Sequence, residues 1–160
     1  MAALALWGVV IYNKLIKNRN MVEEGWSGID VQLKRRSNLI PNLIETAKDY
    51  MGHEKGVLES VTELRTQSIN ASNPRDQGRA EGLLGAALGK LFAVLFAVAE
   101  DYPELKAEGT FIELQENLSE LEEQIQLARR YYNGAVRNLN ILIESFPSNL
   151  IAGHFQFRLA

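Results

Sequence analysis

The chain contains no cysteine, so disulfide bonds, thiolate metal sites and cysteine nucleophiles are excluded. It also lacks an excess of basic residues. Its 17 Lys and Arg stand against 20 Asp and Glu, a net charge of −3, which argues against a nucleic-acid-binding surface. The only basic cluster is Lys34, Arg35 and Arg36. With 160 residues, 46% of them hydrophobic, the chain is long enough for one domain with its own core.

Charge is missing from residues 2–11, AALALWGVVI. This segment has about half of the roughly 20 apolar residues that cross a bilayer, and no basic residue precedes it as in a signal peptide. Three interpretations are open: the last turns of a transmembrane helix whose start lies upstream, a buried first turn of a bundle, or an interfacial anchor. We favour the first and predict that residues 1–11 are the C-terminal end of a truncated transmembrane helix. Basic residues follow at Lys14, Lys17 and Arg19, which favours a cytoplasmic position for the rest of the chain.

Residues 11–50 repeat apolar side chains at alternating steps of three and four, the spacing of a bundle helix. The pattern keeps its phase through Pro41, which removes one backbone hydrogen bond and predicts a kink. We therefore expect one kinked helix rather than two. Its inward positions are Ile11, Leu15, Asn18, Val22, Trp26, Ile29, Leu33, Arg36, Ile40, Leu43, Ala47 and Tyr50.

Three further helices are predicted, over residues 53–69, 75–100 and about 110–146. Phe155 and Phe157 in the tail could fold back on them. The predicted fold is all-α: an antiparallel, up-and-down four-helix bundle over residues 12–160. Its first and last helices are long, and the first projects toward the membrane anchor. The last helix is expected to end at Pro147, and its inward residues are Leu114, Leu118, Leu121, Ile125, Ala128, Tyr132, Ala135, Leu139, Leu142 and Phe146.

The third predicted helix is nearly all apolar, because residues 82–99 contain a single charge, Lys90. Gly85 and Gly89 have the spacing that lets two helices approach closely. We expect this helix to be buried on most sides of the bundle. A second membrane element and a partner-binding groove beside the small residues are the alternatives.

Some catalytic and nucleotide-binding motifs are matched only in part by this chain. His53 and Glu54 resemble the start of H-E-x-x-H, yet Val57 stands where the second histidine belongs. The Glu-x-x-His pairs of di-iron bundles are absent. Gly89-Lys90 lacks the first glycine and the Ser or Thr of a phosphate-binding loop, and no G-x-S-x-G occurs. We therefore predict no enzymatic activity, no metal and no cofactor.

Arg36 lies on the apolar side of the first helix, where a guanidinium needs a carboxylate or carbonyl partner. Glu54, Glu100 and Glu122 are the candidates. A structural ion pair is the expected role, and anion binding is the alternative. For Trp26 and the run Tyr131-Tyr132-Asn133 we expect helix–helix packing, with a partner-binding patch as the alternative.

Five motifs resemble the LemA family, and together they span nearly the whole chain in the family's order. They are W-x-x-I-D-V-Q-L-K-R-R with L-I-P-N-L (26–43), Y-M-G-H-E (50–54), Y-P-E-L-K-A (102–107), A-R-R-x-Y-N-x-A-V (128–136) and F-P-S-N-L-I-A (146–152). The resemblance implies a bacterial protein with one N-terminal transmembrane helix, a short extracytoplasmic N-terminus and a cytoplasmic helical bundle. It implies no established activity. The chain departs from the family in holding only the end of the anchor, and in Asn138-Leu139-Asn140, where the family tends to have an aromatic residue before Asn.

These observations predict a single-pass protein of the bacterial cell membrane, attached through its N-terminal helix, that acts as a scaffold or adaptor for membrane or cytoplasmic proteins. The alternative is a sensor that holds a small ligand or lipid between helices, near Arg36 or near residues 85–89. Candidate structural or partner residues are Trp26, Arg36, Pro41, Asn42, His53, Glu54, Tyr102, Pro103, Arg129, Tyr132 and Asn133.

Overall fold

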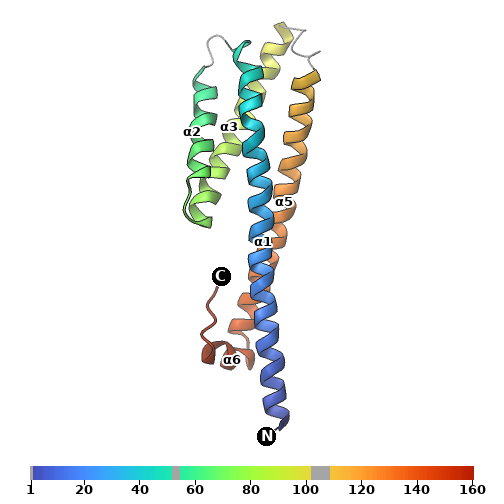
Figure 1. Ribbon diagram of the computed structural model, residues 1–160, viewed down its shortest axis with the longest axis vertical. Coiled ribbons are helices and arrows are strands. Elements are labelled where there is room, and N and C mark those ends of the chain that lie inside the picture. Colours follow the sequence, from blue (N-terminus) through green and yellow to red (C-terminus); the bar gives the residue numbers. More distant parts are fainter. Residues whose placement is uncertain (1, 52–54, 102–108) are drawn as a thin grey trace. The chain divides into compact units, whose positions relative to one another are not determined.

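The computed structural model describes residues 2–51, 55–101 and 109–160. These residues form five helices and no strand: α1 (Ala2–Lys48), α2 (Lys55–Ile69), α3 (Pro74–Asp101), α5 (Gly109–Glu144) and α6 (Ser148–His154) (Figure 1). The all-α prediction is confirmed, while the antiparallel four-helix arrangement stays a prediction. The chain divides into two compact units. Unit 1 comprises Met1–Gln32 and Glu123–Ala160, and unit 2 comprises Leu33–Glu122.

Helix α1 continues through Pro41 without a break, which confirms the prediction of one helix rather than two. The kink expected at Pro41 stays a prediction. Every position that the spacing assigned to the inner side of residues 11–50 is buried or half-buried. The periodicity alone therefore located the inner face of α1 on both sides of the proline.

Helix α3 begins where the local chemistry of the sequence favours a helix start. Asn73 Oδ1 accepts a hydrogen bond from the backbone N–H of Asp76 at 2.9 Å, which satisfies one of the free donors of the first turn. Pro74 occupies the first helical position, where the missing N–H costs nothing. Asp76 adds a carboxylate at the positive end of the helix dipole.

The core of unit 2 receives side chains from α1, α2, α3 and α5. α1 contributes Ile40, Leu43 and Ala47, and α3 contributes a leucine row along one side. That row is Leu84, Leu88, Leu91 and Leu95, all buried. Met51, Leu58, Val61, Ala87, Ala99, Phe111 and Leu118 complete the cluster.

The other side of α3 is exposed, although the sequence predicted a helix buried on most sides. Only 33% of the apolar 18-residue window of Pro74–Glu100 is buried, because the described core residues of unit 2 meet α3 along one face. This expectation was therefore wrong. Among the described residues, Pro74–Glu100 is also the one stretch long and apolar enough to cross a membrane by length and composition, with a mean hydropathy of 2.0.

Unit 1 has a smaller core, formed by the first turns of α1, the end of α5, and α6. Leu15, Leu139 and Ala152 are its buried centre. The tail packs back onto α1, as the sequence allowed: the ring centroids of Tyr12 and Phe155 lie 4.6 Å apart. Phe157 also joins this cluster.

The end of α5 differs from the prediction. The helix stops at Glu144, three residues before Pro147, because a proline disfavours helical backbone at the preceding residue. Phe146 is therefore not an inward residue of α5, and it is 79% exposed. After the short helix α6, Gln156 adopts a left-handed conformation with φ 56°. The Phe157 N–H then donates to the Ala152 carbonyl at 2.9 Å, an arrangement that ends helices and turns the chain back.

Gly25 marks a close approach of α1 to α5 in unit 1. A Cβ at this position would lie 3.1 Å from Tyr131 Cδ1 and 3.1 Å from Tyr132 Cα. The second of these atoms belongs to the backbone and cannot move without shifting the helix. Gly28, one turn further along α1, has nothing within 4 Å of the same position.

The two glycines provide a matched test of this contact. Gly28→Ala removes backbone freedom from a helix without a clash, so it should stabilise the protein by up to about 1 kcal/mol. Gly25→Ala gains the same stabilisation from reduced backbone freedom, but its added methyl group must separate α1 from α5, which costs about 1–3 kcal/mol. In urea unfolding we expect Gly25→Ala to be less stable than Gly28→Ala by about 2 kcal/mol. Equal midpoints for the two variants would contradict the close approach.

Candidate functional site

A buried ion pair joins α1 to α3 in unit 2. The guanidinium of Arg36 donates from Nη2 to Glu81 Oε2 and to the Glu81 backbone carbonyl at 3.2 Å. Both residues are nearly inaccessible, with 3% of Arg36 and 2% of Glu81 exposed. A charge removed from water to this degree persists only when its partner is close and well oriented.

The other two helices of unit 2 extend the ion pair into a network. Arg36 Nη1 donates to Glu122 Oε2 of α5 at 2.8 Å, and the hydroxyl of Ser68 on α2 donates to Glu81 Oε1. The Glu122 side chain is 48% exposed, so only one edge of the network reaches solvent. Each of the four helices described in unit 2 thus supplies one side chain to a single polar cluster, defined here as the Arg36 network: Arg36, Ser68, Glu81 and Glu122.

Sequence reasoning found part of this network. It placed Arg36 inside and named Glu122 as a possible partner. It did not find Glu81, although a signal was present. Glu81 lies three residues before Leu84 and therefore continues the inner row of α3, so a charge at this position needs a partner inside the unit. Glu100 is exposed and is not among the residues bonded to Arg36, and Glu54 lies outside the described residues.

The network is closely packed but not fully satisfied. A Cβ added to Gly85 would lie 3.7 Å from Arg36 Nη1, an ordinary packing distance. Within the described part of the chain, Arg36 Nε and Ser37 Oγ are buried without a hydrogen-bond partner. Both terminal nitrogens of Arg36 already bind carboxylates, which disfavours an anionic ligand at this position. The described residues also hold no group of three or more His, Asp or Glu arranged for a metal ion.

Pro41 connects to the same region through the backbone. Since proline has no N–H, the carbonyl of Ser37 loses its helical partner. Arg65 of α2 replaces that partner, because its Nε donates to Ser37 O at 2.8 Å. The proline of α1 and the arginine of α2 therefore form a compensating pair that the spacing of the sequence did not reveal.

The remaining predicted residues are distributed along the chain. Trp26 and Tyr132 come together in unit 1, with ring centroids 5.7 Å apart in an edge-to-face arrangement. Arg129 is half-buried, while Pro41, Asn42 and Asn133 are exposed. His53, Glu54, Tyr102 and Pro103 lie outside the described residues.

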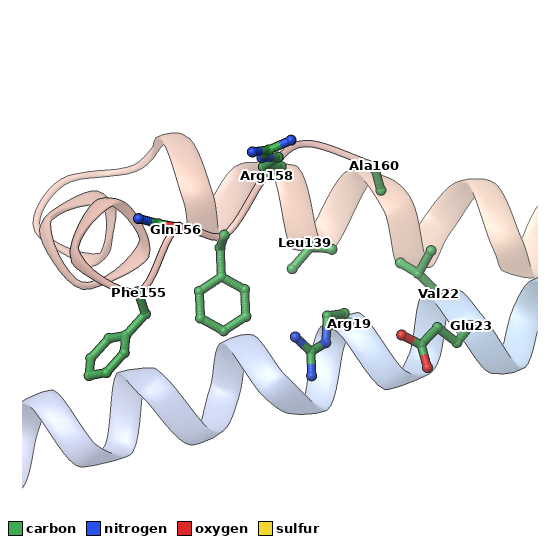
Figure 2. Close-up of a pocket in the computed structure, with 9 residues that line it drawn as sticks. Arg19, Val22, Glu23, Leu139, Phe155, Gln156, Arg158 and Ala160 are labelled. Carbon is green, nitrogen blue, oxygen red and sulfur yellow. The ribbon is translucent and has the colours of Figure 1, made fainter.

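Unit 1 contains a hollow between α1, α5 and the C-terminal tail that no sequence motif predicted (Figure 2). Its volume is about 320 Å³. The guanidinium of Arg19 lies 5.7 Å from the ring centroid of Phe157, within the range of a cation–π contact. The hollow is lined by Arg19, Val22, Glu23, Leu139, Phe155, Gln156, Phe157, Arg158 and Ala160.

Comparison with known proteins identifies relatives of the chain. The model of the LemA family matches residues 25–160. Magnetosome protein MamQ 2 of Paramagnetospirillum magneticum is 26% identical, covering 88% of this chain and 60% of the relative. Protein LemA of Metamycoplasma hominis is 24% identical, covering 88% of this chain and 63% of the relative. The chain thus spans about 60% of the length of the curated relatives it matches.

The Arg36 network makes an asymmetric prediction about stability. Arg36→Met should lower the free energy of unfolding by about 3–5 kcal/mol, because it leaves Glu81 buried without its counter-charge. The double variant Arg36→Met with Glu81→Met should recover most of that loss, because no unpaired charge remains. Urea unfolding of the two single variants and the double variant measures the coupling.

A surface pair provides the control for this experiment. Lys48 donates to Glu45, and this hydrogen bond raises the pKa of Lys48. The pair is solvated, so Lys48→Met should leave the unfolding midpoint unchanged.

If the losses of unfolding free energy for Arg36→Met and Glu81→Met simply add in the double variant, the two charges do not stabilise each other.

The pair formed by Pro41 and Arg65 predicts a second coupling. Arg65→Met leaves the Ser37 carbonyl without a donor and should cost about 1–2 kcal/mol. In a Pro41→Ala background the backbone N–H returns to Ser37 O, so the same Arg65→Met change should cost much less. A double-mutant cycle in urea tests this. If Arg65→Met costs the same in both backgrounds, Arg65 does not act by replacing the missing N–H.

Proposed function

The chain belongs to the LemA family, and from that premise we propose that it is a membrane-anchored, non-enzymatic helical bundle acting as a scaffold or adaptor for membrane or cytoplasmic proteins. In this proposal residues 1–11 end a single transmembrane helix of the bacterial cell membrane. The following helices form an up-and-down bundle on the cytoplasmic side. The basic residues Lys14, Lys17 and Arg19 after the uncharged segment support that orientation.

The exposed side of α3 is the observation on which the scaffold role depends. We call it the outer face of α3. Its two large residues, Leu83 and Phe96, are about half exposed. The remainder is small, apart from Lys90 in its middle. Soluble proteins rarely leave an apolar helix face of this length uncovered unless something binds there. The exposed small residues of the outer face are Gly82, Ala86, Gly89, Ala93 and Ala97.

The size of these side chains favours a protein helix as the binding partner. Glycine and alanine allow two helix backbones to approach closely, and the apolar contact then extends over several turns. Leu83 and Phe96 lie at separate points of this face, where they can fill gaps on a partner surface. Lys90 gives the partner one charge to match, which adds specificity to an otherwise apolar contact.

Ligand sensing is the second candidate. The sequence named the regions of Arg36 and of residues 85–89 for it, and the hollow of unit 1 is a further place. At Arg36 the guanidinium is already neutralised by Glu81 and Glu122, which disfavours an anionic ligand there. The hollow of unit 1 favours a ligand more, since it combines apolar walls with the side chains of Arg19 and Arg158. Apolar walls with a few polar groups are typical of ligand sites.

The scaffold proposal predicts that single charges on the outer face of α3 remove partners without unfolding the protein. Leu83→Glu and Phe96→Glu both change exposed residues, so their unfolding midpoints should stay within about 0.5 kcal/mol of the parent. The measurement is affinity capture of the tagged full-length protein from native bacterial membranes, followed by quantitative mass spectrometry. We expect a reproducible set of partners for the parent and at least a tenfold loss, about 1.4 kcal/mol, for each variant.

The control is Ile112→Glu on α5, which introduces the same charge at another exposed apolar residue of unit 2. It should retain the partners of the parent. Repeated capture that returns no reproducible partner would overturn the scaffold role. If Ile112→Glu removes the same partners as Leu83→Glu, the loss comes from charge in general, and the outer face of α3 is not the binding surface.

A further inference from the structure

Helix α6 packs against the uncharged start of α1. A Cβ on Gly8 would lie 3.7 Å from Ile151 Cδ1, and the rings of Tyr12 and Phe155 are 4.6 Å apart. Both contacts lie within unit 1, and Figure 1 shows α6 beside the first turns of α1. The C-terminal part of the chain is therefore level with residues 8–12, where the uncharged segment of α1 ends.

Large apolar side chains on both partners of this contact point to solvent. On α1 they are Leu6, Val9 and Val10, which flank Gly8. On the other side Leu150, the neighbour of Ile151, is 61% exposed, and Phe146 is more exposed still. We call these five residues the α1–α6 face: Leu6, Val9, Val10, Phe146 and Leu150. They form an exposed apolar belt and not one side of α1, because Leu6 and Val10 lie about half a turn around the helix from Gly8. In a solvated protein these exposed side chains would be an unusual concentration of uncovered apolar surface.

Positive charge predominates around this face, although the exposed Glu144 lies two residues before Phe146. Residues 1–22 and 145–160 contain no Asp or Glu, although the chain has 20 of them. The same two segments contain four basic residues, Lys14, Lys17, Arg19 and Arg158. A surface that is apolar and bordered mainly by positive charge is complementary to a layer with an apolar interior and anionic headgroups.

The order of these features along α1 also matches a bilayer. The exposed apolar residues come first, and Lys14 follows Val10 after one helical turn, roughly 6 Å along the axis. Arg19 follows about 8 Å beyond Lys14. Apolar side chains at the boundary of the acyl region, with basic side chains one to two turns further out, are typical of segments that lie at a membrane surface.

We propose that the α1–α6 face is a membrane-contacting surface, in which Phe146 and Leu150 insert at the headgroup boundary of an anionic bilayer beside the anchor. This inference rests on the proposed membrane anchoring of α1 and extends it. The protein is held at the membrane by two segments, α1 and α6, that come from opposite ends of the chain. Two packed segments fix the rotation of unit 1 about the anchor, which a single helix cannot do.

Site-directed fluorescence can test this surface, because the absence of cysteine allows labelling at single positions. The variants are Leu150→Cys, Val9→Cys and Leu127→Cys, each coupled to a polarity-sensitive fluorophore. Val9 reports the anchor. Leu127 is another exposed leucine of unit 1, on α5 and roughly 25 Å along the helix from its end at Glu144. The full chain is mixed with vesicles of phosphatidylcholine and phosphatidylglycerol, some with brominated acyl chains that quench nearby fluorophores.

We expect the labels at Val9 and Leu150 to shift to the blue on vesicle addition and to be quenched by bromine close to the headgroups. The label at Leu127 should stay in water. In the unlabelled protein, Phe146→Ser with Leu150→Ser should weaken partitioning into these vesicles by at least about tenfold. Circular dichroism of each variant verifies the helices. Phe146→Cys replaces Leu150→Cys if that variant does not fold.

The other possible results contradict this inference in different ways. If Val9 enters lipid while Leu150 stays in water, this inference is wrong and the anchor remains. If both labels stay in water, the proposed anchoring fails and this inference fails with it. If the Leu150 label shifts without vesicles and the shift grows with protein concentration, a second copy of the chain covers the face, and the membrane is not its partner. Equal binding to vesicles of phosphatidylcholine alone would contradict the role of the four basic residues.

Discussion

The packing of unit 2 depends on the contact between Arg36 and Glu81. Removing a charge from water costs several kcal/mol per ion, and the attraction between the two groups offsets this only when they face each other closely. A pair of leucines tolerates a small displacement along the helix with a modest loss, but a shift of α3 along α1 would leave two buried charges unpaired. We therefore infer that the ion pair selects the register of these helices more than it adds stability. Ser68 and Glu122 tie α2 and α5 to the same point.

In unit 1 the helices are aligned by the sizes of their side chains and not by a buried ion pair. Its buried centre is apolar, and the contact of α1 with α5 depends on a glycine that a single methyl group would disturb. Directly after Gly25, Trp26 meets Tyr132 edge to face, so a small residue and a large one define the same level of the two helices. Close packing of this kind is sensitive to volume but not to pH or salt. The alignment of helices therefore depends on an ion pair in unit 2 and on close packing in unit 1, although α1 contributes to both units.

The periodic spacing of residues along one helix predicted which side chains face inward. It did not predict contacts that depend on which residue of a second helix lies opposite. The three-four spacing located the inner face of α1 through Pro41, and it placed Arg36 inside. Spacing cannot show which carboxylate reaches a buried arginine, so Glu122 was one of three candidates and Glu81 was missed. The role of Arg65 at the Ser37 carbonyl was hidden for the same reason. Phe146 continued the period of α5, but the backbone restriction before Pro147 ended the helix first, and the residue became exposed.

Charge distribution gives the two units different relations to a membrane. Unit 2 contains 15 acidic and 10 basic residues, a net charge of −5, while unit 1 contains 5 acidic and 7 basic residues, a net charge of +2. An anionic bilayer attracts the positively charged unit 1 and repels the negatively charged unit 2, over about one Debye length. Unit 2 is therefore disfavoured from lying flat on the lipid, even though α3 exposes an apolar face. In the proposed scaffold role that face contacts proteins, because its surface is mostly glycine and alanine, which permit close contact with another helix.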